Sequence, residues 1–504
     1  MNLIRDIFLY NPNEPFLFTN MAFWIYFVAV YLIYSLCYKN LTIRNAYLFL
    51  ISIFFYYKTG GILVLLLLFS IVFNFSLALA IVKAVKQNIK KLWLIIGVSV
   101  NLLILFYYKY TYFLVDWLNK LSGFDIEVRD YLAAAGNTVF NAHFDVTSII
   151  LPIGISFFTF QALSYIIDVY KKSIPPLKNI TEFGFYIAYF PQLVAGPIMR
   201  ATEFIPQISR KFALTKNEFG HAAFLILNGL IKKMVISDFI SLNFVDRVFE
   251  NPHMFTGIEN LMAVYGYAIQ IYCDFSGYTD IAIGLALLMG FRIPINFNSP
   301  YKAYSLVDFW RRWHISLSSW LRDYLYIALG GNRKGLVRTY ANLIITMLLG
   351  GLWHGANIKF VIWGALHGFG LVVNKLIVGI LPKQSNTPVW QKALGWIITF
   401  HFVCFAWIFF RADSMETAFS IINNIATRLD LSLTANVLLQ YATTFIILTI
   451  GFTIHWLPTK WKETYRGAFI KTPMYAKVLI VLISCLIIYQ FKTSEIQPFI
   501  YFQF

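Results

Sequence analysis

The sequence predicts an all-α membrane protein with about ten or eleven transmembrane helices, accompanied by re-entrant and interfacial helices. Of its 504 residues, 59% are hydrophobic and only 13% are charged. A soluble domain could not bury that much apolar surface. In addition, apolar stretches close to the roughly 20 residues needed to cross a bilayer recur from one end of the chain to the other.

The candidate spans are apolar runs bounded by polar or charged residues. Two of them, 45–57 and 183–199, have the wrong length for simple crossings, so we expect segments of this kind to enter and leave the membrane on one face. The full set covers residues 17–38, 45–57, 61–82, 92–108, 148–170, 183–199, 219–240, 261–290, 340–381, 391–410, 437–458 and 474–491.

The formal net charge of +17 is informative through its placement, because loops kept in the cytoplasm accumulate Lys and Arg. Residues 83–91 carry four lysines, whereas 109–147 holds five acidic residues against three basic ones. Together with Lys39 and Arg44 in the first loop, this pattern predicts that the amino terminus lies outside. The basic residues lie at span ends rather than in a stripe on a soluble domain, so the bilayer is the expected partner and nucleic acid is not.

We find no linker, low-complexity tract or internal repeat, and therefore predict one membrane domain over residues 1–504. The four cysteines are scattered through apolar stretches without paired spacing. This pattern favours buried thiols over a disulfide framework or a zinc site, and no metal is expected. The cysteines are Cys37, Cys273, Cys404 and Cys485.

The longest polar stretch in the interior of the chain runs from Asn296 to Arg338. Ser305 can cap a helix that begins near Leu306, with Asp308 in its first turn, where the helix dipole favours a negative charge. Apolar side chains at three- and four-residue spacing predict that this helix continues to Asp323 as an amphipathic element. An element of this kind belongs at the membrane interface or in a cavity wall. Its apolar face consists of Trp310, Trp313, Leu317 and Trp320 or Leu321.

Two histidines stand out because a titratable group among membrane spans is costly and usually has a task. His314 lies on the amphipathic helix, where a purely structural hydrogen-bonding role is at least as well supported. His354 lies in an apolar segment beside Gly350, Gly351 and Gly355, and such glycines let a backbone or a ligand approach closely. A neutral imidazole can take a proton from a hydroxyl near neutral pH. We therefore predict that His354 is catalytic.

Other common chemistries lack support. The chain has no phosphate-binding loop and no Gly-x-Ser-x-Gly elbow, and His354 and His367 are too far apart to form a helical metal pair. His367 and His401 lie in apolar helices, where bonds to nearby carbonyl groups would satisfy them.

Six blocks in one order resemble the membrane-bound O-acyltransferase family of the bacterial polysaccharide type, with most similarity to its alginate-acetylating branch. They extend over most of the region from about 150 to 415, and their joint order makes the resemblance specific. The blocks are Phe190-Pro-Gln-Leu-Val-Ala-Gly-Pro197, Tyr272-Cys-Asp-Phe-Ser-Gly-Tyr-Thr-Asp280, Asn296-Phe-Asn-Ser-Pro-Tyr301, Asp308 to Asn332, Gly350-Gly-Leu-Trp-His-Gly355 and Phe410-Arg-Ala-Asp413.

The resemblance implies helices around a tunnel in the cell inner membrane, with His354 matching the invariant histidine of the family and His314 its second characteristic position. We therefore predict that both are catalytic: His354 removes the proton from the acceptor hydroxyl, and His314 holds or polarises the donor carbonyl or orients the acceptor. It implies acetyl transfer from a cytoplasmic thioester, such as acetyl-CoA, to a hydroxyl on the outer side, for O-acetylation of an exported polysaccharide. No permanently bound cofactor is expected. A periplasmic or extracellular hydrolase-like acetyltransferase is the implied partner. As donor-binding residues, we predict Arg311, Arg312 and Arg322 for coenzyme A phosphates, although pairing with Asp308 and Asp323 or lipid contact would explain them equally.

Two other functions remain open from the sequence. D-alanyl transfer to a teichoic acid is the close competitor within the same enzyme class. A polytopic transporter is the alternative from another class, and matching sequence halves, which would favour it, are not visible.

Overall fold

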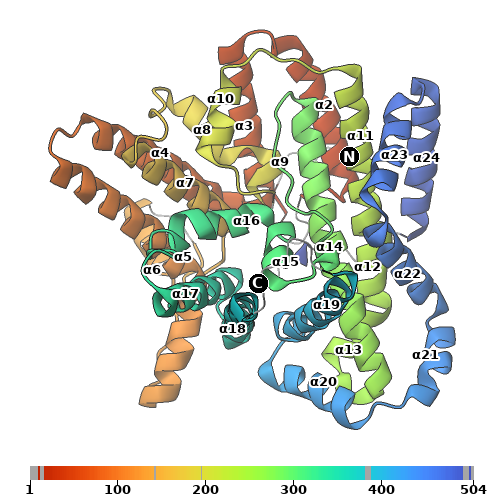
Figure 1. Cartoon of the computed structure of the whole chain (residues 1–504). Helices are drawn as coiled ribbons and strands as arrows, with labels where there is room; N and C mark the ends of the chain where they lie inside the picture. The colour runs from red at the N-terminus through yellow and green to blue at the C-terminus, as the bar shows by residue number, and fades with distance from the viewer. Residues whose placement is uncertain are drawn as a thin grey trace. The chain divides into compact units, whose positions relative to one another are not determined.

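The computed structural model describes residues 10–11, 16–140, 144–194, 196–380, 388–491 and 499–500. In this part of the chain all regular structure is helical (Figure 1). The predicted all-α class is therefore confirmed. Residues 1–9 lie outside the described residues, and the outside position of the amino terminus stays a prediction.

The helices form two compact units. The first comprises Met1–Val194, Met199–Lys211 and Gly355–Asn357. The second comprises Ala195–Ile198, Phe212–His354 and Ile358–Phe504. A single functional domain over 1–504 stays a prediction.

Buried polar side chains join the helices of the first unit. Arg44 donates a hydrogen bond to the carbonyl oxygen of Arg210 (2.8 Å), and the amides of Asn74 and Asn101 exchange hydrogen bonds of 2.8 and 3.2 Å. In an apolar setting such contacts bind helices to one another. The helices are α2 (Met21–Cys37), α3 (Leu41–Gly60), α4 (Val64–Lys83), α5 (Gln87–Ser122), α6 (Tyr131–Phe140), α7 (Ile155–Tyr170), α8 (Ile180–Ala188), α9 (Phe190–Leu193) and α10 (Ala201–Ile208), with the 3₁₀ turn η1 (Gly61–Leu63).

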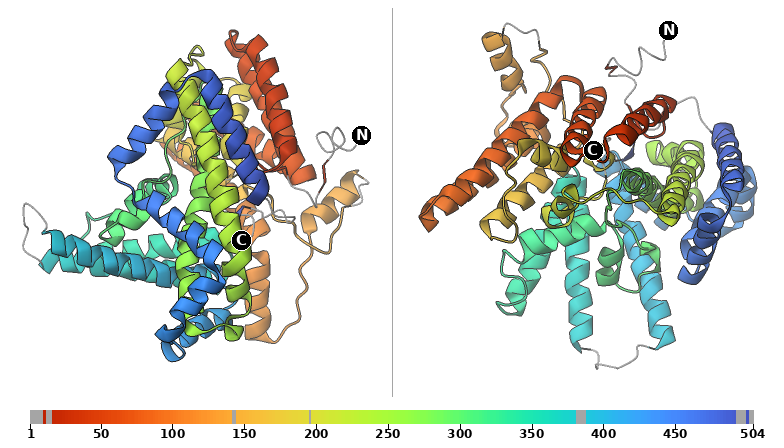
Figure 2. Two further views of the ribbon diagram at one scale, coloured as in Figure 1. Left: turned by 90° about the vertical axis from the view of Figure 1, so that its right-hand side faces the viewer. Right: turned by 90° about the horizontal axis from the view of Figure 1, so that it is seen from above.

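The second unit is built around the long helix α14 (Gly257–Leu288), which begins at a capping box between Thr256 and Glu259. In its most apolar window, 83% of the residues are buried, so it packs against protein on most sides. Helix α11 (Lys216–Leu230) runs beside it (Figure 2), where Gly229 and Gly277 let the two backbones approach closely. Three π-helical segments interrupt this unit: η2 (Ile231–Ser237), η3 (Ser241–Val245) and η6 (Leu321–Tyr326).

The remaining elements of the second unit follow in chain order. They are α12 (Asp238–Ile240), α13 (Asp246–Glu250), η4 (Pro252–Met254), η5 (Pro300–Lys302), α15 (Leu306–Arg312), α16 (Ile315–Trp320), α17 (Leu336–His354), α18 (Ile358–Ile380), α19 (Val389–Arg411), α20 (Met415–Thr427), η7 (Leu431–Leu433), α21 (Thr434–Gln440), α22 (Ala442–Trp456), α23 (Thr459–Lys471) and α24 (Met474–Phe491).

Buried ion pairs connect η2 to α14. The ammonium group of Lys233 lies 2.6 Å from Asp274 and 2.8 Å from Asp238, and that of Lys232 lies 2.8 Å from Asp280. Charges in such a place persist only when they are paired. The block from Tyr272 to Asp280 thus includes the acidic partners of two lysines that the sequence did not connect to it.

Among the described residues, seven helices are long and apolar enough to cross a membrane, or eight if the pair Leu431–Gln440 and Ala442–Trp456, bent by 98°, is one span. The estimate of ten or eleven crossings is not confirmed. The predicted 340–381 segment divides into α17 and α18, and the predicted 183–199 segment contains only the short helices α8 and α9.

The cysteines of the described residues are free thiols. Cys273 and Cys404 are buried as expected, whereas Cys37 is only partly buried. Cys485 on α24 is exposed, so the prediction of a buried thiol is wrong there. Only 11% of the apolar window of α24 is buried within the protein. Its apolar surface therefore faces outward, as expected for a lipid-facing helix.

Candidate active site

His354 is the last residue of α17 and is only 3% exposed. Aromatic rings surround its imidazole. The ring centroids of Trp363 and Phe410 lie 5.0 and 5.2 Å from that of His354, both edge-to-face, and that of Trp353 lies at 5.0 Å. This aromatic wall separates the imidazole from bulk water, and electrostatic interactions strengthen in such an environment.

His314 lies at a break in the predicted amphipathic helix. Helix α15 ends at Arg312, and His314 adopts a left-handed conformation (φ 43°, ψ 56°) before α16 begins at Ile315. The predicted cap by Ser305 is confirmed by its 3.1 Å hydrogen bond from the Asp308 backbone. The prediction of one continuous helix to Asp323 is wrong, because the reversal at His314 turns its side chain into the interior, where it is fully buried.

Asn296 holds His314 in one orientation. The side-chain oxygen of Asn296 accepts hydrogen bonds of 3.0 Å from the backbone N–H and the hydroxyl of Ser316, and it lies 3.3 Å from Nδ1 of His314. Because a backbone N–H can only donate, this Asn296 atom is the acceptor oxygen, and Nδ1 of His314 carries the proton. In the neutral ring, Nε2 is then the basic nitrogen. No role for Asn296 was predicted from the sequence.

Burial also determines the charge of His314. Desolvation lowers its pKa to about 3, and its backbone hydrogen bond opposes this only in part. The imidazole is therefore neutral at physiological pH. A neutral ring with Nδ1 already donating can accept a hydrogen bond at Nε2 but cannot donate one there.

One indole contacts both predicted histidines. The ring centroid of Trp353 lies 5.9 Å from that of His314 and 5.0 Å from that of His354. The two imidazoles are therefore separated at most by the sum of these distances, although 40 positions separate them in the sequence.

The glycines beside His354 bring helices together. A Cβ atom on Gly351 would collide with the carbonyl oxygen of Phe360 on α18, and one on Gly364 would collide with the carbonyl oxygen of Met347 on α17. Of the two possibilities that the sequence offered, close backbone approach is observed at Gly351. This approach places Trp363 of α18 next to His354.

A third buried histidine supports the same wall. Nδ1 of His367 accepts a 3.3 Å hydrogen bond from Nε1 of Trp310, and its ring centroid lies 4.7 Å from that of Trp363. The expectation of a carbonyl partner is wrong for His367. For His401 it is confirmed, because Nδ1 lies 2.8 Å from the carbonyl oxygen of Ile397.

The three predicted donor-binding arginines differ in their surroundings. Arg312 forms an ion pair of 2.8 Å with Asp308, and Arg322 one of 2.6 Å with Asp323. Arg311 is exposed. The pairing alternative is therefore observed for two of them, and their role toward a donor stays a prediction.

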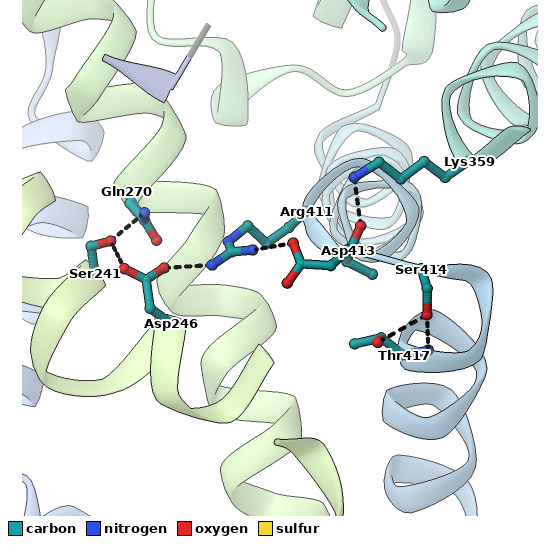
Figure 3. A network of polar contacts seen from close by, with 9 residues as sticks. Ser241, Asp246, Gln270, Lys359, Arg411, Asp413, Ser414 and Thr417 are labelled. Carbon is teal, nitrogen blue, oxygen red and sulfur yellow. Dashed lines mark hydrogen bonds and ion pairs between the residues drawn. The ribbon is translucent and has the colours of Figure 1, made fainter. Parts of the chain in front are cut away.

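The Phe410-Arg-Ala-Asp413 block is held by a polar network (Figure 3). Arg411 lies between Asp246 of α13 (2.7 Å) and the more exposed Asp413 (3.3 Å). The second oxygen of Asp246 accepts a short hydrogen bond from Ser241, which accepts one of 2.8 Å from Gln270 of α14. The network thereby fixes the end of α19 against α13 and α14.

Lys359 completes this anchor at the start of α18. Its ammonium group donates a 2.7 Å hydrogen bond to the carbonyl oxygen of Ala412, directly after α19 (Figure 3). The neighbouring Phe410 contacts both His354 and Trp363. The polar network therefore positions one side of the aromatic wall, a connection that the sequence did not reveal.

No group of three or more His, Cys, Asp or Glu side chains with a metal-binding arrangement occurs in the part of the chain that the structure describes.

Comparison with known proteins identifies the family of the chain. Residues 49–418 match the model of the membrane-bound O-acyltransferase family. The chain is 41% identical to the probable alginate O-acetylase of Pseudomonas aeruginosa (80% of this chain, 73% of that protein) and 37% identical to the peptidoglycan O-acetyltransferase of Helicobacter pylori (84% and 81%). It is 29% identical to the teichoic acid D-alanyltransferase of Bacillus subtilis (53% and 70%). The chain therefore belongs to the membrane-bound O-acyltransferase family and is an O-acyltransferase.

Proposed function

We propose that this enzyme moves an acetyl group from a thioester donor, such as acetyl-CoA, on the cytoplasmic side of the inner membrane to a hydroxyl on the outer side. The product is an O-acetylated exported polysaccharide. The observation that carries the proposal is that two buried histidines, His314 and His354, contact the same indole, that of Trp353, and that aromatic rings surround His354. Two relatives named for O-acetylation of polymers, alginate and peptidoglycan, support acetyl as the group.

In the proposed reaction, His354 removes the proton from the acceptor hydroxyl as its oxygen attacks the thioester carbonyl carbon. The carbon–oxygen bond forms, the carbon–sulfur bond breaks, and the proton passes from His354 to the leaving thiolate. The products are an ester and a free thiol. An aromatic wall that excludes water favours transfer to the acceptor hydroxyl, because water would otherwise hydrolyse the thioester.

The tautomer of His314 narrows its proposed role. With Nδ1 donating to Asn296, the neutral ring can accept a hydrogen bond from the acceptor hydroxyl or the leaving thiol. It cannot donate a hydrogen bond that would polarise the donor carbonyl, the other role predicted for it from the family resemblance. We therefore assign His314 to orienting the hydroxyl or thiol.

Asn296 supplies the missing donor in this scheme. Its side-chain nitrogen is buried and has no hydrogen-bond acceptor among the described residues, while its oxygen is fully engaged. Such a nitrogen costs free energy until an acceptor reaches it. We assign it to the thioester carbonyl oxygen, where negative charge develops during attack.

The immediate acceptor follows from the same proposal. A hydrolase-like acetyltransferase outside the cytoplasm would receive the acetyl group on a hydroxyl and pass it to the polymer.

D-alanyl transfer to a teichoic acid is the competing function, supported by the relative from Bacillus subtilis. Acetyl is favoured because the O-acetylating relatives match more of this chain at higher identity. Family membership leaves the transporter alternative without support.

The test reconstitutes the full chain in liposomes with isotopically labelled acetyl-CoA and, in parallel, a D-alanyl-charged carrier protein. Acceptors are alginate oligosaccharides, peptidoglycan fragments and teichoic acid, each with and without a candidate partner. Mass spectrometry then identifies the modified polymer. We expect labelled acetyl esters on a polysaccharide, whereas D-alanyl esters without acetyl esters would reject the acetyl assignment.

A further inference from the structure

Two lysines from distant parts of the sequence meet at the corner between α22 and α23. Lys462 on α23 donates hydrogen bonds to the hydroxyl of Ser299 (2.9 Å) and to the carbonyl oxygen of His455 (2.8 Å). Lys302 in η5 donates to the carbonyl oxygen of Leu457 (2.7 Å). Both ammonium groups therefore lie at one corner, on carbonyls two positions apart.

The corner has a surplus of positive charge. Nearby Lys232 and Arg312 each have a carboxylate partner, Asp280 and Asp308. Within the described residues, the hydrogen-bond partners of Lys302 and Lys462 are neutral oxygens. An ammonium group has three N–H donors, so each lysine retains capacity for a further acceptor.

The two lysines also repel one another. Burial lowers the pKa of Lys462 to about 8, and the charges of Lys302 and Lys232 add to this effect. The pKa of Lys302 is lowered by burial and by Arg312. Concentrated positive charge of this kind is relieved when an anion binds.

Hydrogen bonds hold the segment that carries Lys302, and this segment leads to the candidate active site. Tyr301 donates its backbone N–H to Nε2 of His455 (3.1 Å), and its carbonyl accepts a 2.8 Å hydrogen bond from Trp396. Ser299 has a left-handed backbone (φ 45°), a conformation that surrounding structure must enforce in a residue with a side chain. The same segment begins at Asn296, which holds His314.

From these contacts we propose that Lys302 and Lys462 form a binding site for a phosphate group. The segment 296–302 spans at most roughly 20 Å when fully extended, so it joins this site to His314 over a short distance. A pantetheine thioester separates its reactive carbonyl from its phosphates by a flexible arm. The phosphate of such a donor is therefore the favoured source, and the headgroup of an anionic lipid is the other source of the same chemistry. The assignment to the donor rests on the proposed function, but phosphate binding itself does not.

The test uses the full chain in nanodiscs of phosphatidylcholine, carrying His354→Ala so that turnover cannot complicate binding. The variant is Lys302→Gln with Lys462→Gln, because glutamine can still donate to the same carbonyls without charge. Lys460→Gln, an exposed lysine on α23, is the matched control. Calorimetry measures the Kd for coenzyme A and for pantetheine, which lacks phosphate.

We expect the double variant to weaken coenzyme A binding about tenfold or more, with pantetheine and Lys460→Gln unaffected. A second arm measures retained phosphatidylglycerol by native mass spectrometry. Loss of phosphatidylglycerol with unchanged coenzyme A binding would assign the site to a lipid headgroup and reject the donor assignment. If the double variant binds coenzyme A and retains phosphatidylglycerol to the same extent as the control, the phosphate site does not exist.

Folding is checked with Lys302→Arg and Lys462→Arg, which keep the charge and should restore binding. Failure of the phosphate site can be distinguished from failure of the proposed function. Absence of acyl transfer in the reconstituted parent would reject the function even if phosphate binds here.

Discussion

The side-chain oxygen of Asn296 lies 3.3 Å from Nδ1 of His314 and receives two hydrogen bonds from Ser316. This relationship determines the tautomer of a buried histidine without any charged partner. It also leaves the amide nitrogen of Asn296 without an acceptor among the described residues.

Replacing Asn296 by Ala removes the oxygen that orients His314 and the nitrogen that we assign to the thioester carbonyl oxygen. One lost charge-stabilising donor is worth about 1–3 kcal/mol, so we expect acyl transfer to fall roughly tenfold or more. Steady-state kinetics with the purified full chain measures this change. Asn298→Ala, two positions along the same segment, is the control. Equal activity of Asn296→Ala and the parent would show that the amide takes no part.

The low pKa of His314 predicts a pH dependence of stability. The folded-state pKa is depressed to about 3 from a reference near 6.5, so between these values the unfolded chain binds one more proton and stability falls as the pH falls. From pH 6.5 to 5 this residue alone should remove roughly 2 kcal/mol.

The variant His314→Asn has no imidazole at this position, so its unfolded chain does not take up the additional proton. Thermal unfolding in detergent at pH 7, 6 and 5 should therefore show a smaller loss of Tm for His314→Asn than for the parent. Parallel curves for the two proteins would mean that His314 is protonated in the folded state.

The pair between Arg411 and Asp246 should contribute to stability through its burial. Arg411→Ala leaves the Asp246 carboxylate without its closest cation, which typically costs about 3–5 kcal/mol for a buried pair. Combining it with Asp246→Ala should restore part of that loss, as measured by a double-mutant cycle in chemical unfolding. Strict additivity would show that the two side chains are not coupled. Because Phe410 precedes Arg411, we also expect Arg411→Ala to reduce turnover.

Gly351→Ala tests the close approach of α17 and α18. A methyl group there meets the Phe360 carbonyl, so we expect destabilisation of about 1–3 kcal/mol from overpacking and reduced acyl transfer through displacement of His354. Gly379 on the same α18 has open space around it, so Gly379→Ala should be neutral or slightly stabilising. Thermal unfolding of the two variants compares them. If both behave alike, the fit of Gly351 is not what holds the helices together.

Local signals in the sequence predicted the class of fold and several details. Composition and span-length runs indicated a polytopic helical protein, Ser305 indicated a cap, and the glycines beside His354 indicated close approach. The number of crossings was harder to predict, because runs such as 340–381 do not reveal where a helix ends. At His354 the helix stops within a continuous apolar stretch.

The break at His314 had no comparable signal. A left-handed histidine is unfavourable by itself, and the contacts of Asn296 and Ser316 that stabilise it become visible only in three dimensions. The same holds for Arg411 with Asp246 and for Lys302 with Lys462, which are separated by well over a hundred residues. Sequence patterns identify such residues as polar exceptions in apolar surroundings but do not pair them.

The central claim, that His354 is the base of an acyl transfer, is tested most directly by comparing His354→Ala with His401→Ala, a histidine exposed on α19. The measurement is the rate of acetyl transfer from acetyl-CoA by folded protein whose coenzyme A affinity matches that of the parent. We expect His354→Ala to lose about 10²- to 10⁴-fold in rate while His401→Ala keeps the parent rate. A folded, donor-binding His354→Ala protein that transfers acetyl groups as fast as the parent would contradict the claim.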